Sequence, residues 1–151
     1  MSTNHSYQVK LNWEEDRKGI MQSLVLNSKI EVATPPDFPK GVPGIWSPEH
    51  LFVASVNSCL MTTFLAIAEY SKLEFSNFEC NAIGILDKVE GKYMISEINL
   101  QVKLEITDSS KKDKALRIIE KSEKACLISN SIKTTIKLET EILINQSIIN
   151  Y

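Results

Sequence analysis

The sequence predicts an α+β fold in which antiparallel sheets pack against a long buried central helix and a second helix. Segments before position 34 and after position 75 alternate between apolar and polar side chains, as half-buried strands do. An apolar segment without formal charge covers residues 51–68. With 43% hydrophobic and 24% charged residues, the 151-residue chain is expected to form one domain over residues 1–151.

The N-terminal third is expected to form a small antiparallel sheet. Residues 7–13 and 18–27 alternate in character, and the polar segment EEDRKG between them favours a hairpin turn. Residues 29–34 form a third, short candidate strand. Four prolines and two glycines in residues 35–46 exclude regular structure there and indicate a loop.

The central helix is predicted to begin at Ser47 and to run to about Ser71. Ser47 is a hydroxyl N-cap, Pro48 occupies a position where its missing N–H is harmless, and Glu49 places a carboxylate at the positive helix end. Apolar side chains then cover nearly the whole circumference: Leu51, Phe52, Val53, Ala54, Val56, Leu60, Met61, Phe64, Leu65 and Ile67. Such a helix is expected to be buried on all sides.

Two environments suit so apolar a helix. Its length reaches that of a membrane span, but five Ser, Thr and Asn side chains and the lack of a flanking basic cluster favour burial in a core. A single sheet rarely covers a helix on every side, so we expect a second copy of the chain, related by a two-fold axis, to complete the cover. The sequence thus predicts a homodimer and no membrane partner.

The C-terminal half is predicted to contain a long hairpin, a helix and a last strand. Glu90-Gly91 separates two alternating segments and is a strong hairpin signal. Polar capping residues followed by apolar positions at helical spacing indicate the second helix. The expected elements are strands at 75–89 and 93–107, a helix within 107–126 and a strand at 134–145. Helices gathered on one side of an antiparallel sheet define the α+β class.

The composition limits the partners and the compartment. A net charge of −2 with both signs mixed gives no electrostatic reason to expect a nucleic acid or an anionic membrane, so the substrate is expected to be small. Three cysteines are too few and too odd in number for a disulfide-stapled scaffold. The N-terminal segment MSTNHSYQVK lacks the features of a signal peptide, and we expect a cytoplasmic protein.

The cysteines differ in what their positions suggest. Cys80 shares a strand face with Phe78 and is expected to be a core residue. Cys59 lies in the middle of the long helix, and at an ordinary pKa of about 8.5 only about 3% of it would be thiolate at pH 7. A reactive Cys59 therefore needs a nearby cation or hydrogen-bond donors. The chain has two arginines, Arg17 in the polar turn and Arg117 on the second helix, and both positions suit a solvated charge.

Two motifs resemble the OsmC/Ohr family of thiol peroxidases, the osmotically induced and organic-hydroperoxide-resistance proteins. The first is SPEHLFVASVNSCLMTTF at residues 47–64, with a cysteine ten residues after the glutamate. The second is EKACLISNSIK, whose cysteine follows 67 positions later. The order of predicted elements matches the family over residues 6–145, and the residues around the first cysteine are most similar to the OsmC-like branch.

This resemblance implies an intertwined homodimer with two active sites at the subunit interface. It implies that Cys59 is the peroxidatic cysteine, which reduces an organic hydroperoxide, and that Cys126 resolves the resulting sulfenic acid as a disulfide. By the same carry-over, Glu49 is the active-site glutamate and Arg17 is the only candidate for the thiolate-stabilising arginine. The reductant would be a dithiol, such as a lipoyl group, and no cofactor or metal is implied.

Two features qualify this carry-over. Ohr-type members usually have proline directly after the second cysteine, where this chain has Leu127. Glu49 and Cys59 are ten residues apart, so a straight helix separates them by about 15 Å along its axis. If Glu49 serves the site of Cys59, we expect it to come from the partner subunit, with the two long helices packed antiparallel.

Two rival interpretations use the same residues. The dimer could hold an apolar ligand without catalysis, the cysteines serving in packing or redox sensing. Alternatively Cys59, Cys126, His50 and Glu49 could bind a metal, although the chain has no paired C-x-x-C or H-x-x-x-H spacing. His50 is more typical of a surface residue at a helix start. The apolar segment itself favours an alkyl or fatty hydroperoxide over hydrogen peroxide, because its binding energy would come from apolar burial.

Overall fold

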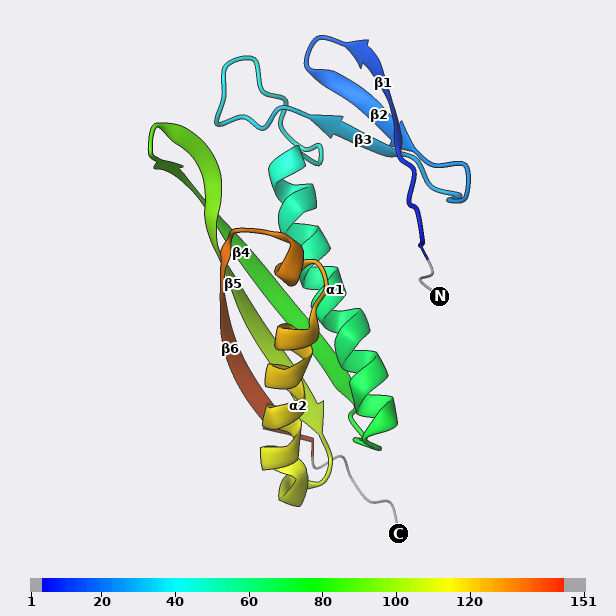
Figure 1. The fold of residues 1–151 in the computed structure, drawn as a ribbon, viewed down its shortest axis with the longest axis vertical. Coiled ribbons are helices and arrows are strands. Elements are labelled where there is room, and N and C mark those ends of the chain that lie inside the picture. The colour runs from blue at the N-terminus through cyan, green and yellow to red at the C-terminus, as the bar shows by residue number, and fades with distance from the viewer. Residues whose placement is uncertain (1–3, 146–151) are drawn as a thin grey trace. The chain divides into compact units, whose positions relative to one another are not determined.

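The computed structural model describes residues 4–145 and divides the chain into two compact units, of which the first ends at Leu51 and the second begins at Phe52. Figure 1 shows the elements in chain order. They are β1 (Lys10–Glu15), β2 (Lys18–Gln22), β3 (Ile30–Ala33), α1 (Pro48–Tyr70), β4 (Asn77–Val89), β5 (Lys92–Ile106), η1 (Ser109–Lys111), α2 (Lys112–Ala125), η2 (Ser129–Ser131) and β6 (Thr135–Ile144). The α+β class is confirmed, while the single domain over residues 1–151 stays a prediction.

The first unit contains a three-stranded antiparallel sheet in the order β1-β2-β3. The predicted EEDRKG hairpin is present, because Glu15 pairs with Lys18 across a turn made of Asp16 and Arg17. Asp16 adopts a left-handed backbone with φ 45°, which aspartate tolerates better than most residues. The predicted second strand extended to residue 27, but β2 ends at Gln22 and a turn follows.

Helix α1 begins where the capping signal predicted. The Ser47 Oγ accepts a hydrogen bond from the His50 N–H at 3.1 Å, and the Ser47 carbonyl accepts from the Leu51 N–H at 2.9 Å. Ser47 itself is fully buried. The helix ends at Tyr70, and Lys72 then takes a left-handed conformation with φ 57° that turns the chain away.

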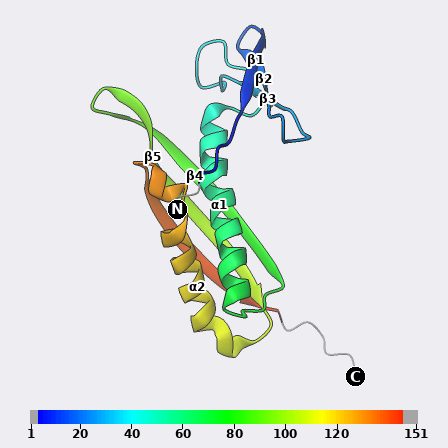
Figure 2. The ribbon, with the colours of Figure 1, turned by 45° about the vertical axis from the view of Figure 1, so that its right-hand side comes forward.

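The second unit contains a mixed sheet in the order β4-β5-β6, with α1 and α2 on the same face (Figures 1 and 2). β4 and β5 form the predicted long hairpin, whose turn residues Glu90 and Gly91 both have positive φ, as this turn requires. The pairing of β6 differs from the expected antiparallel arrangement, since β6 runs parallel to β5. The reason is that α2 carries the chain back along the sheet before β6 begins.

The core of this unit lies between the sheet and the two helices. Alternate residues of β5 face it, and Phe64 of α1 packs against Phe75 and Phe78 with ring centroids 5.1 and 4.9 Å away. The fully or almost fully buried apolar residues are Val56, Leu60, Phe64, Ala68, Leu73, Ile98, Leu100, Val102, Leu104, Ile106, Ala115, Ile118 and Ile119. These contacts hold α1 and α2 against one sheet.

One chain covers α1 on one side. The buried stripe repeats every four residues from Val56 to Ala68, while Met61 and Leu65 on another face are 40% and 41% exposed. Burial on all sides is therefore not reached within a single chain. In residues 4–145, α1 is the helix that is long and apolar enough to cross a membrane by length and composition. Its buried stripe is that of a helix packed on a sheet.

Gly84 gives a test of how closely α1 approaches the sheet. A methyl group at Gly84 in β4 would overlap the Cγ2 methyl of Val53 in α1. We expect Gly84→Ala to lower the free energy of unfolding by about 1–3 kcal/mol, the usual cost of overpacking. Denaturant unfolding measures it. Val53→Ala, combined with Gly84→Ala, should recover part of the loss; the same cost in both backgrounds would contradict this contact.

Candidate functional site

Cys59 lies in the middle of α1 and is partly buried. Its helix is tied to the sheet at this level, because the Asn57 side-chain amide donates a hydrogen bond to the Cys80 carbonyl of β4 at 3.1 Å. The Ser58 hydroxyl donates to the Ser55 carbonyl within the helix at 3.3 Å. Asn57 therefore explains one polar residue in an otherwise apolar segment: it fixes the position of Cys59 relative to the sheet.

Cys126 is the first residue after α2 and is fully buried. Its N–H donates to the Glu123 carbonyl at 3.1 Å, and its carbonyl accepts from the Asn130 N–H at 3.1 Å. Both of its backbone groups are thus held by the end of α2 and by the turn that follows. The structure brings Cys126 close enough to Cys59 for each thiol to shift the pKa of the other. Both cysteines are free.

Opposing effects set the pKa of the Cys59 thiol. Burial raises it, but hydrogen bonds from the Cys126 thiol, the Ile128 N–H, the Thr63 hydroxyl and the Leu127 N–H together outweigh burial and lower the pKa below its ordinary value. The Thr63 Oγ1 lies 3.9 Å from the Cys59 sulfur. These donors favour the thiolate of Cys59, which is the nucleophilic form of cysteine.

The pKa of the Cys126 thiol moves the other way. Burial raises it, and so does the neighbouring Cys59, while the nearby Ser129 lowers it by less. Cys126 therefore keeps its proton when Cys59 has lost its own. The two sulfurs form an unequal pair, one suited to attack and the other to donate a proton.

Cys80 is confirmed as a packing residue. It is partly buried against the core with Phe78 and Ala82, and burial raises its pKa to about 11. At neutral pH its thiol is protonated and inert.

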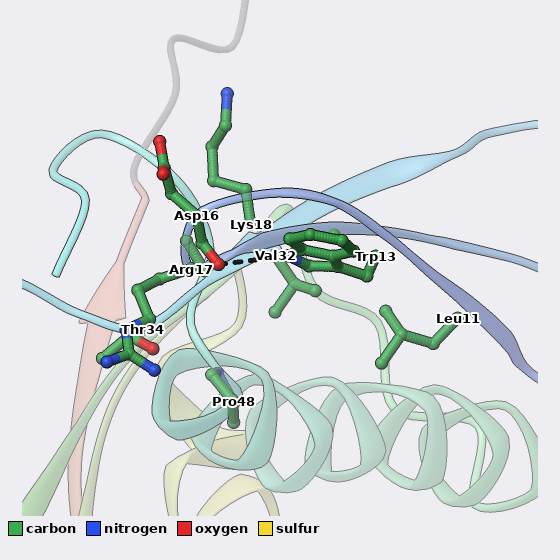
Figure 3. Close-up of a pocket in the computed structure, with 10 residues that line it drawn as sticks. Leu11, Trp13, Asp16, Arg17, Lys18, Val32, Thr34 and Pro48 are labelled. Carbon is green, nitrogen blue, oxygen red and sulfur yellow. Dashed lines mark hydrogen bonds between the residues drawn. The ribbon is translucent and has the colours of Figure 1, made fainter. Parts of the chain in front are cut away.

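Arg17 lies at the turn between β1 and β2, with an exposed side chain. It lines a cavity of about 480 Å³ in the first unit, together with Leu11, Trp13, Thr34 and Pro48 among others (Figure 3). Figure 3 shows the guanidinium extending toward Thr34. A cation at the rim of an apolar hollow can bind an anionic or strongly polar group, although Arg17 and Glu49 form no ion pair in the described part of the chain.

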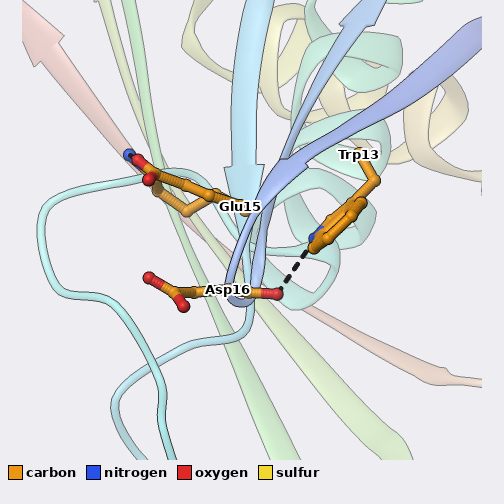
Figure 4. A network of polar contacts seen from close by, with 4 residues as sticks. Trp13, Glu15 and Asp16 are labelled. Atoms are coloured by element: carbon orange, nitrogen blue, oxygen red, sulfur yellow. Dashed lines mark hydrogen bonds and ion pairs between the residues drawn. The ribbon is translucent and has the colours of Figure 1, made fainter.

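The turn that carries Arg17 is braced by its neighbours. The Trp13 Nε1–H donates to the Asp16 carbonyl at 3.1 Å (Figure 4). Lys18 forms an ion pair with Glu15 at 3.4 Å. The exposed pair adds little stability, but the tryptophan bond fixes the peptide that precedes Arg17. Arg17 is thus held at the backbone, and its side chain is exposed.

Glu49 lies in the first turn of α1, as predicted, and its Oε1 is buried without a hydrogen-bond partner among residues 4–145. An unpartnered buried carboxylate oxygen is unusual in a folded protein. Arg17 and Glu49 belong to the first unit, whereas Cys59 and Cys126 belong to the second.

The rival metal site of Cys59, Cys126, His50 and Glu49 finds no support in the geometry of residues 4–145. Within residues 4–145, no group of three or more His, Cys, Asp and Glu side chains is arranged to hold a metal ion. His50 is exposed, and its Nδ1 lies 2.7 Å from the Ser47 Oγ, so it belongs to the helix cap as the sequence suggested.

The sequence did not identify the donors that surround Cys59. Thr63 was accessible to sequence reasoning, because it lies four residues after Cys59 on the same helix. The N–H groups of Leu127 and Ile128 had no such signal, because every residue except proline carries one. Their role depends on where the turn after α2 lies.

The pKa directions predict the order in which the cysteines react. We expect iodoacetamide to modify Cys59 first as the pH rises, because its lowered pKa supplies thiolate at lower pH than an ordinary cysteine does. Cys80, whose pKa is about 11, should react only at higher pH than Cys59. Peptide-level mass spectrometry over about pH 6 to 10 measures the rates. In urea the three cysteines should react alike; parallel labelling of Cys59 and Cys80 in the folded protein would contradict the assignment.

Comparison with known proteins places this chain in a family. The family model described as OsmC-like protein matches residues 41–141. The uncharacterized protein YmaD of Bacillus subtilis (strain 168) is 26% identical over 144 residues, covering 91% of this chain and 93% of that protein.

Solved structures share the fold. An OsmC-like protein of unknown function from Vibrio cholerae has a TM-score of 0.81 at 24% identity, covering 91% of this chain and 100% of that one. An organic hydroperoxide resistance protein from Elizabethkingia anophelis has a TM-score of 0.75 at 20% identity, covering 96% and 100%. The family model spans more than half of the chain and includes Cys59, Cys126 and Glu49, so this protein belongs to the OsmC-like family.

Proposed function

We propose that this protein is a thiol-dependent peroxidase that reduces organic hydroperoxides, with Cys59 as the peroxidatic and Cys126 as the resolving cysteine. The observation that supports it is the neighbouring pair of Cys59, whose pKa is lowered, and Cys126, whose pKa is raised. The names of several structural relatives, organic hydroperoxide resistance proteins among them, agree with this chemistry.

In the first step the Cys59 thiolate attacks the terminal oxygen of the hydroperoxide. A sulfur–oxygen bond forms, the oxygen–oxygen bond breaks, and the alkoxide takes up a proton and leaves as an alcohol. The sulfur is oxidised to a sulfenic acid and the peroxide is reduced. The Cys126 thiol, already donating a hydrogen bond at this site, is a nearby proton source for the leaving oxygen.

In the second step Cys126 resolves the sulfenic acid. Its sulfur, having lost its proton, attacks the Cys59 sulfur; a disulfide forms, the sulfur–oxygen bond breaks, and the leaving hydroxide takes a proton from solvent to become water. A dithiol reductant, such as a lipoyl group, then reduces the disulfide by exchange and restores both thiols. Cys126 lies close enough to shift the pKa of Cys59, and we expect a movement of the turn after α2 to bring the two sulfurs to bonding distance.

The substrate is proposed to be an alkyl or fatty hydroperoxide. Leu127, directly after the resolving cysteine, is 67% exposed. An exposed apolar side chain next to Cys126 favours a substrate that contributes apolar surface, at about 25 cal/mol per Å² buried. Hydrogen peroxide gains nothing from such contacts.

The active form is proposed to be a homodimer. Val9, Leu11 and Trp13 alternate along the start of the chain and are 63%, 61% and 76% exposed, and Leu65 of α1 is 41% exposed. Exposed apolar stripes of this kind mark interaction surfaces. A second copy of the chain would cover both the strand stripe and the free face of α1.

Glu49 and Arg17 are proposed to complete the site. An arginine would satisfy the buried, unpartnered Glu49 oxygen through a charge-assisted bond, and the carboxylate would in turn orient the guanidinium. α1 is continuous over Glu49 and Cys59, so the helical rise keeps them about 15 Å apart along the axis in one chain. We therefore assign Glu49 to the Cys59 of the other copy. The free thiols suit a reducing compartment, and we propose the cytoplasm.

A peroxidase assay tests the proposal. With cumene hydroperoxide and dihydrolipoamide, we expect wild type to turn over and Cys59→Ser to lose all activity, because it removes the nucleophile. Cys126→Ser should consume about one equivalent of peroxide and then over-oxidise at Cys59, because nothing resolves the sulfenic acid. Cys80→Ser, a matched control, should remain active. Activity in Cys59→Ser, or no turnover by wild type with apolar ligand binding intact, would refute the peroxidase.

Mixed dimers test the assignment of Glu49. Equal amounts of Cys59→Ser and Glu49→Gln chains, dissociated and refolded together, should regain about a quarter of the wild-type sites, because half of the dimers are mixed and hold one intact site each. Each variant alone should be weak or inactive. If Glu49 served the cysteine of its own chain, the mixture would show only the sum of the separate activities.

A further inference from the structure

The hydroxyl side chains of α1 are used in two different ways. Three of them donate to the carbonyl three residues earlier: Ser55 to Phe52 at 2.6 Å, Ser58 to Ser55 at 3.3 Å and Thr62 to Cys59 at 3.1 Å. Bonds of this kind satisfy a hydroxyl on the backbone of its own helix. Thr63 departs from the pattern, because its Oγ1 lies 3.9 Å from the Cys59 sulfur and within hydrogen-bonding range of it.

The spacing explains why Thr63 reaches the sulfur and Thr62 does not. Residues four apart lie on the same face of a helix, so the side chain at position 63 faces the one at position 59. Thr62 lies one step around the helix, is exposed, and already bonds to the Cys59 carbonyl. Among residues 4–145, the contact with Cys59 is the one hydrogen bond of the Thr63 side chain.

We propose that Thr63 stabilises the Cys59 thiolate, its hydroxyl donating directly to the sulfur. The inference rests on the proposed function, because it assigns a role to Thr63 in preparing the nucleophile of that reaction. The Thr63 side chain is partly buried, so water competes with this bond less than it would at an exposed position. The adjacent Thr62 has no part in it.

Ionisation of Cys59 decides which atom donates. In the neutral pair either the thiol or the hydroxyl can be the donor. A thiolate has no proton, so the hydroxyl must then donate, and bonds to an ionised acceptor are roughly twice as strong as neutral ones. The bond therefore strengthens when Cys59 ionises, which favours the thiolate.

Other properties of the site agree with this role. The middle of α1 gains nothing from the helix dipole, so the thiolate depends on groups in direct contact with it. Burial raises the pKa of Cys59, but hydrogen-bond donors that include the Thr63 hydroxyl lower it by more. A hydroxyl on the same helix as the sulfur also keeps its place whenever the helix is intact.

Three substitutions separate the hydroxyl from its surroundings. Thr63→Val removes the hydroxyl and keeps the branched shape of the side chain. Thr63→Ser keeps the hydroxyl and removes the methyl group. Thr62→Val is the matched control, because it makes the same change one residue earlier, at a hydroxyl that bonds to the Cys59 carbonyl instead of the sulfur.

The test is the pH profile of Cys59 alkylation by iodoacetamide, measured by peptide-level mass spectrometry. We expect Thr63→Val to raise the midpoint by about half a pH unit, as the loss of one modest hydrogen bond would. Alkylation at pH 7 should slow about two-fold, less than the thiolate fraction falls, because a thiolate of higher pKa is the better nucleophile. Thr63→Ser and Thr62→Val should keep the wild-type profile.

Two results would overturn the inference. The first is a Thr63→Val profile that coincides with that of Thr62→Val, and the second is a shift in Thr63→Ser as large as in Thr63→Val, which would assign the effect to packing. Cys80, whose pKa is about 11, reports on folding, because it reacts slowly as long as the core is intact. If Thr63→Val exposes Cys80, Thr63→Ala removes the hydroxyl without adding a methyl group and is judged by the same two criteria.

The readout separates this inference from the proposed function. Alkylation reports the thiolate of Cys59 without peroxide, and peroxide turnover is measured independently on the wild type. A profile shifted by Thr63→Val alone, in a protein that reduces no hydroperoxide, would uphold the role of Thr63 and refute the peroxidase. An unshifted profile in an active peroxidase would do the reverse.

Discussion

The proximity of Cys59 and Cys126 depends on two helices packing against one face of the β4-β5-β6 sheet. The cysteines are 67 residues apart, and the shared core is what brings the middle of α1 to the end of α2. Where α1 ends and α2 begins, the Lys114 ammonium of α2 donates to the Ser71 carbonyl at 2.7 Å. The reactive geometry is thus fixed by the core and by this second tie, because a rotation of either helix would separate the sulfurs.

Features that the sequence predicted correctly have local causes. The cap at Ser47, the hairpin turn at Glu90-Gly91 and the end of α2 before Cys126 each follow from a few adjacent residues whose backbone preferences agree. Cys80 was identified as a core residue because strand alternation fixes the face of its side chain. The motif around Cys59 predicted the family for a similar reason, since its residue types stand at fixed spacing.

Features that the sequence missed are set by contacts between distant segments. β6 alternates as clearly in a parallel pair as it would in an antiparallel one, so its pattern could not reveal its direction. The all-round apolar character of α1 predicted more burial than one chain provides, because composition does not say which chain supplies the cover. The donors at Leu127 and Ile128 are backbone groups, and residue type carries no trace of them.

Hydrogen-bond donors and an arginine would activate a thiolate in different ways. An ammonium or guanidinium acts over several ångströms, is screened by salt and must be kept in place, whereas an N–H acts only in contact and is held by its own backbone. In the proposed mechanism Arg17, oriented by Glu49, would act on the oxygen that leaves, where negative charge develops during the reaction. The lowered pKa of Cys59 and the raised pKa of Cys126 arise within one unit of one chain, to which neither Arg17 nor Glu49 belongs.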